Sequence, residues 1–123
     1  MSRPVVPAGW PEGVRPPGTP DWERTAVAWL FDLCPPDYRA HEVLRRHPVV
    51  LARFAAHHVQ AGIEAARRGL GTARDELREV ADPQTVAAAV SAYEREGARL
   101  VVTSRAVGLV EDALRGRRFV ARL

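Results

Sequence analysis

The chain has 123 residues, a length that allows one domain with a modest core and leaves no room for a second full domain. All 18 basic residues are arginine, so phosphate-binding and Schiff-base lysines are excluded, together with most ATP-dependent activities. The net charge is only +3, and arginine without lysine, beside abundant alanine and valine, is typical of GC-rich codon usage. The arginine content alone is therefore weak evidence for nucleic-acid binding.

The cysteine content and the length of the apolar runs indicate the compartment in which the protein is expected to function. The only cysteine, Cys34, excludes an internal disulfide, a multi-cysteine zinc site and a CxxC redox pair. No apolar run reaches the length of a membrane span, and the first residues carry no apolar signal core. We therefore expect a cytoplasmic protein, in a reducing compartment, without membrane contact.

The first twenty residues hold six of the ten prolines and three of the nine glycines, a density that opposes helix and paired strand. We therefore expect residues 1–19 to form a disordered arm. Its prolines could form a polyproline II ligand, or Trp10 could pack on its own domain.

Two short helices are expected after the arm. Thr19 offers a capping hydroxyl and Pro20 suits a first helical turn, which predicts a helix over 20–33. Its apolar side chains extend beyond one stripe, so it must be substantially covered. Two prolines follow it and end it, and a shorter helix is expected over 37–46.

Pro83 is the only proline after residue 48, and this predicts two long helices, over 48–79 and 83–115. Asp82 would cap the second of them. The connection between them is too short for any arrangement except antiparallel neighbours. The expected fold is all-α: two short N-terminal helices and a long antiparallel helical hairpin in one domain (20–115), followed by a basic tail (116–123).

A seven-residue repeat indicates how the two long helices meet. The second helix repeats large residues and the first repeats small ones, which allows close approach. Facing positions then sum to 162, which places Gly62 opposite Leu100, Gly69 opposite Tyr93 and His58 opposite Ser104. The predicted hairpin seam consists of Ala55, His58, Gly62, Ala65 and Gly69 on the first helix and Val86, Tyr93, Leu100, Val107 and Leu114 on the second.

A second apolar stripe lies beside this seam, and one hairpin contact cannot bury both. The short helices are too small to cover the whole hairpin, so two hairpins meeting in a four-helix bundle would bury the excess. This predicts a homodimer, unless the N-terminal arm folds back and completes the cover. The candidate oligomer face consists of Val59, Ile63, Leu70, Leu77, Val102 and Leu109.

No residue can be nominated for catalysis, cofactor binding or metal binding. His57 and His58 are adjacent and point about 100° apart on a helix, so they cannot hold one ion from one face. Cys34 suits a buried position, and a reactive pair with His41 is geometrically possible without being suggested.

The interpretation favoured by these patterns is a non-enzymatic module for protein–protein interaction or oligomerisation, whose partner is itself, another protein, or both. The alternative is a nucleic-acid-associated protein that uses arginines of the long helices and of the C-terminal tail. The tail candidates are Arg115, Arg117, Arg118 and Arg122, which occur with no acid among positions 115–123. An enzyme or small-ligand binder is the third class.

Overall fold

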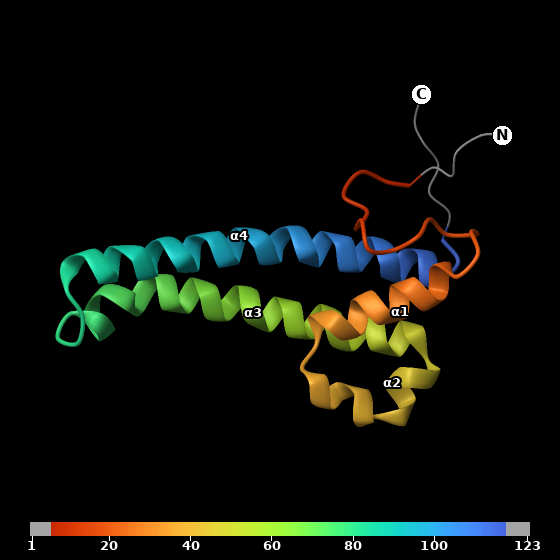
Figure 1. Cartoon of the computed structure of the whole chain (residues 1–123), viewed down its shortest axis with the longest axis horizontal. Coiled ribbons are helices and arrows are strands. Elements are labelled where there is room, and N and C mark those ends of the chain that lie inside the picture. Colours follow the sequence, from red (N-terminus) through yellow and green to blue (C-terminus); the bar gives the residue numbers. More distant parts are fainter. Residues whose placement is uncertain (1–5, 118–123) are drawn as a thin grey trace.

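The computed structural model describes residues 6–117, and within this range the chain is all-helical with no strand. Four α-helices and one 3₁₀ helix follow each other along the chain. Figure 1 shows two long helices running side by side, joined by a turn at one end and accompanied by two short helices at the other. The elements are α1 (Trp22–Leu33), η1 (Pro36–Ala40), α2 (Glu42–Arg46), α3 (Pro48–Leu77) and α4 (Pro83–Leu114).

The start of α1 differs from the predicted start. Thr19 does not cap the helix, because its hydroxyl donates a hydrogen bond to the carbonyl of Pro16 (2.6 Å). The N-cap position is taken by Asp21 in the left-handed region, with φ of 65° and no side-chain capping bond. Proline at positions 16, 17 and 20 holds the preceding backbone in turns, so the helix begins at Trp22.

The helix predicted over 37–46 is broken into two pieces. His41 is extended between η1 and α2. In one continuous helix Tyr38 and Leu44 would lie about 120° apart, whereas the break turns both toward α3. Leu44 is fully buried, and the Tyr38 ring meets Phe54 of α3 edge-on at 6.1 Å between centroids.

The capping of α4 agrees with the sequence. The Asp82 carboxylate accepts a hydrogen bond from the backbone N–H of Thr85 (2.7 Å), and Pro83 occupies the first helical position. The hydrogen bonds to this carboxylate hold its pKa below the ordinary value. The cap fixes where the chain turns back after α3, and with it the register of the hairpin.

The hairpin has the register expected from the seven-residue repeats. A Cβ atom built at Gly62 would lie 3.0 Å from Leu100 Cδ1, and one built at Gly69 would overlap ring carbons of Tyr93. Both pairs sum to 162. Glycine is required at position 69 for the Tyr93 ring to lie against the α3 backbone.

The main core lies at the open end of the hairpin, where all four helices meet. Its largest fully buried side chains are Leu30 of α1, Leu44 of α2, Leu51 of α3, and Val107 and Val110 of α4. We define the far half of the hairpin as residues 64–98, and it projects away from α1 and α2 toward the turn (Figure 1). Buried apolar residues there are small: Ala66, Ala73 and Val90.

Part of the predicted disordered arm packs on this core. Val14 is buried, and the indole N–H of Trp10 donates to the carbonyl of Val14 (2.9 Å), which closes a turn. A Cβ at Gly9 would lie 3.7 Å from Leu109 of α4, so the arm crosses the end of that helix. These apolar side chains bury one face of residues 6–19 despite their proline content. The described part of the arm is therefore folded back on the domain, which was the alternative to a disordered arm.

Candidate functional site

The far half of the hairpin carries a shallow apolar groove of about 250 Å³ between α3 and α4. No residue of α1, of α2 or of the described part of the arm (6–19) lines it. We call this feature the hairpin groove, and its lining consists of Ile63, Ala66, Arg67 and Leu70 from α3 and Tyr93, Glu94, Gly97, Ala98 and Val101 from α4.

The α3 side of the groove belongs to a second seven-residue repeat. This repeat is apolar throughout the helix and consists of Val49, Ala56, Ile63, Leu70 and Leu77. A second stripe, three residues after the first at each repeat and nearer to α4, is buried in the hairpin. It consists of Ala52, Val59, Ala66 and Ala73. Two adjacent apolar stripes on one helix are typical of a helix with neighbours on two sides.

Small residues bring the two helices close together beneath the groove. A Cβ atom built at Gly97 would lie 3.7 Å from the Cβ of Ala66, an ordinary contact distance. The two backbones can therefore approach closely, and the groove above them is shallow. Ala98 at its edge is exposed.

Two opposite charges border the groove at one level of the hairpin. Arg67 of α3 and Glu94 of α4 both line it, and their numbers sum to 161, one from the value for facing positions. Neither makes an ion pair with any other residue in the range 6–117. Elsewhere on the hairpin, Arg99 is paired with Glu96 on its own helix (2.6 Å). The groove therefore has one basic and one acidic wall.

The residues of the candidate oligomer face differ in burial. Val59 is only 3% exposed and does not line the groove, so it belongs to the hairpin interior and not to a free face, whereas Ile63 lines the groove although it is only 4% exposed. The physical reason is that the seam is wider than one stripe, because small residues let the helices interpenetrate. Leu109 lies beneath the arm at Gly9. Leu70 lines the groove, Leu77 is half-buried near the turn, and Val102 is 62% exposed on α4.

The residues of the predicted seam also differ in burial. Ala55 and Val107 are fully buried, whereas Gly62, Gly69, Val86, Leu100 and Leu114 are half-buried and Tyr93 is 38% exposed. His58 and Ala65 are exposed, which differs from their seam assignment. The buried centre of the seam on α3 lies at Val59 and Ala66, so His58 and Ala65 fall outside it.

The ring of His58, which the register places opposite Ser104, meets the Tyr38 ring edge-on, with centroids 6.0 Å apart. His57 is exposed. Among residues 6–117 no three histidine, cysteine, aspartate or glutamate side chains gather as a metal site. In that same range no helix is long and apolar enough to cross a membrane.

Cys34 is buried at the end of α1. Burial raises the pKa of its thiol, and the guanidinium of Arg39 opposes the rise only in part. A thiol is nucleophilic only as the thiolate, so this environment suits a packed side chain better than a reactive one.

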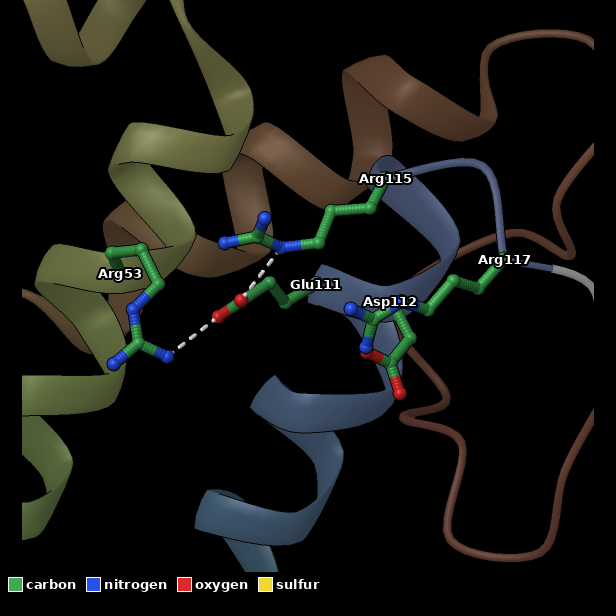
Figure 2. Close-up of polar contacts among 5 residues, drawn as sticks. All are labelled: Arg53, Glu111, Asp112, Arg115 and Arg117. Atoms are coloured by element: carbon green, nitrogen blue, oxygen red, sulfur yellow. Dashed lines mark hydrogen bonds and ion pairs between the residues drawn. The ribbon is translucent and has the colours of Figure 1, made fainter.

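Two of the four candidate nucleic-acid contacts are engaged with acids of α4. Figure 2 shows the Glu111 carboxylate between two guanidinium groups, from Arg53 of α3 (3.0 Å) and from Arg115 (2.9 Å). Arg117 pairs with Asp112 at 2.7 Å. Glu111 itself is only 8% exposed, so this cluster ties the open end of α4 to α3. Arg118 and Arg122 lie outside the described residues.

A further pocket, of about 610 Å³, lies where the arm meets α4. Trp10 and Trp22 line it, together with Asp112 and Arg117, whose charges neutralise each other. Sequence analysis did not identify this pocket, although the possible packing of Trp10 on its own domain pointed to the contact. Among residues 6–117, the charged side chains that line this pocket are Asp112 and Arg117, and they pair with each other.

Known proteins add nothing to this description: no family model, no curated protein and no solved structure matches the chain. Function is therefore argued from three features of the molecule itself. These are the hairpin groove, the tryptophan-lined pocket and the paired arginines at the end of α4. Only the groove combines apolar lining with unpaired charges.

Proposed function

We propose that the chain is a non-enzymatic helical interaction module that associates with a second copy of itself through the hairpin groove. Two hairpins packed groove to groove form a four-helix bundle. The observation that carries the proposal is the uncovered apolar groove of the far half, in which Leu70 of α3 is only half-buried and Ala98 of α4 is exposed.

The lengths of the helices explain why the groove is uncovered. Helix α3 has 30 residues and so is about 45 Å long, whereas the 12 residues of α1 span about 18 Å. Helix α1 therefore covers less than half of one hairpin face, and Figure 1 places it at the open end. Apolar surface that lies together on one face of a soluble chain usually marks an interface.

Nucleic-acid binding is the competing function, and the open end of α4 lends it less support. A phosphate would have to compete with Glu111 for Arg115 and with Asp112 for Arg117. Mixed charge of this kind is typical of a solvated or stabilising surface rather than of a phosphate-binding patch.

Light scattering after size exclusion tests the proposal directly. At high micromolar concentration we expect a mass of twice 13.6 kDa for the full-length protein. Leu70→Glu places a carboxylate in the groove and should give a monomer with unchanged helical circular dichroism. Val80→Glu is the matched control, because Val80 is 76% exposed in the turn and lies outside the groove.

A wild-type mass of 13.6 kDa at that concentration would refute self-association. A Leu70→Glu protein that remains dimeric would place the interface on another face. Unfolding of Leu70→Glu would still leave the wild-type mass as a test of the proposal.

A further inference from the structure

The two walls of the hairpin groove differ in charge, and this difference orients the pairing of two copies. We infer that the hairpins associate in parallel, with both turns at the same end, so that α3 of each copy packs against α4 of the other. Arg67 of each copy then pairs with Glu94 of its partner. The inference rests on the proposed self-association and specifies its geometry.

Arg67 and Glu94 lie at the same level along the hairpin. Gly62 faces Leu100 and Gly69 faces Tyr93, so residues whose numbers sum to about 162 lie at one level. Arg67 and Glu94 therefore share a level on opposite walls. A two-fold axis parallel to the helices keeps every residue at its level and brings α3 of one copy opposite α4 of the other. It creates two symmetric Arg67–Glu94 pairs beside an apolar interface, as at the edges of coiled coils.

The opposite arrangement, with the turns at opposite ends, places like walls together. A two-fold axis perpendicular to the helices packs α3 against α3 and α4 against α4. The positions that flank the α3 stripe at seven-residue intervals are Arg53, Gln60, Arg67 and Arg74, with no acid among them. Within the described range 6–117, only Arg53 of these residues has an acidic partner in its own chain, Glu111. The antiparallel pairing therefore opposes basic rows, and electrostatic complementarity selects the parallel one.

Spin-label distances at the turn distinguish the arrangements. Val80→Cys in a Cys34→Ser background gives one exposed label site per chain. Parallel pairing places the two labels about 15–35 Å apart, because packed helices are separated by about 10 Å and the labels add their own length. Antiparallel pairing about a two-fold axis at the level of the groove separates them by about 40 Å, because in each copy the turn lies about 20 Å along the helix axis from the groove centre.

A long distance would overturn the parallel arrangement and leave self-association intact. Loss of the dipolar signal, together with a monomeric mass, would overturn self-association itself. The two failures are therefore distinguishable in one sample.

Charge reversal tests the proposed pair. Arg67→Glu and Glu94→Arg should each weaken dimerisation by roughly tenfold in sedimentation experiments, and the double variant should restore it. Arg99→Glu is the matched control, because this substitution changes the charge by the same amount at a position outside the hairpin groove. Equal weakening by the control, or no recovery in the double variant, would refute the pairing of Arg67 with Glu94.

Discussion

The contact between Gly69 and Tyr93 allows a test of the hairpin register with a matched control on the same helix. A Cβ atom at Gly69 would overlap the Tyr93 ring, whereas one at Gly71 would meet nothing within 4 Å. Both Gly→Ala changes raise intrinsic helix propensity by about 1 kcal/mol. Overpacking at position 69 costs about 1–3 kcal/mol, because the ring must leave its place against α3. We therefore expect Gly71→Ala to be the more stable of the two variants by about 1–3 kcal/mol.

Thermal and urea unfolding at one fixed protein concentration measures this difference. For a chain of this size, 1 kcal/mol changes the melting temperature by about 4 °C. In a Tyr93→Ala background the ring is gone, so Gly69→Ala should stabilise as Gly71→Ala does. Equal stabilisation by both alanines in the wild-type background would refute the contact, and with it the register in which facing positions sum to 162.

Two further predictions concern the open end of α4. Glu111→Gln removes the carboxylate that two arginines share in a partly buried site and should destabilise by about 1–3 kcal/mol in urea unfolding, whereas Asp75→Asn, in an exposed pair with Arg78, should change stability by less than about 0.5 kcal/mol. Equal effects would mean that the Glu111 cluster contributes no more than a surface pair. At physiological salt we expect no saturable DNA or RNA binding in fluorescence anisotropy, and submicromolar binding lost on removal of residues 115–123 would instead support the nucleic-acid function.

The parts of the fold that the sequence predicted are those set by local signals. Proline and aspartate at 82–83 mark the start of α4, and the seven-residue repeats determine which residues face each other. The break at His41 had no such signal, because it depends on Tyr38 and Leu44 both reaching α3. The packing of Val14 was likewise hidden, and that of Trp10 was only an alternative to a disordered arm, since proline-rich composition reports on local conformation and not on tertiary burial.

The burial of the candidate oligomer face likewise could not be predicted from the sequence. Periodicity identified two apolar stripes on α3, but it could not say how deeply the helices interpenetrate. That depth is set by small residues such as Gly97 and Ala66, and it buries Val59 in the interior and leaves Ile63 only 4% exposed at the groove. The charges at 67 and 94 were visible in the sequence, yet only the fold places them on opposite walls of one groove.

The two ends of the hairpin differ in what their burial contributes to stability. At the open end, leucines and valines are fully buried, and each contributes about 1.5–3 kcal/mol of hydrophobic free energy. In the far half the buried apolar residues are Ala66, Ala73 and Val90, which remove much less surface from water. A two-helix hairpin gains little from its own seam, and the ordering entropy of each residue opposes it. The proposed association through the hairpin groove would add apolar burial along the section that the monomer stabilises least.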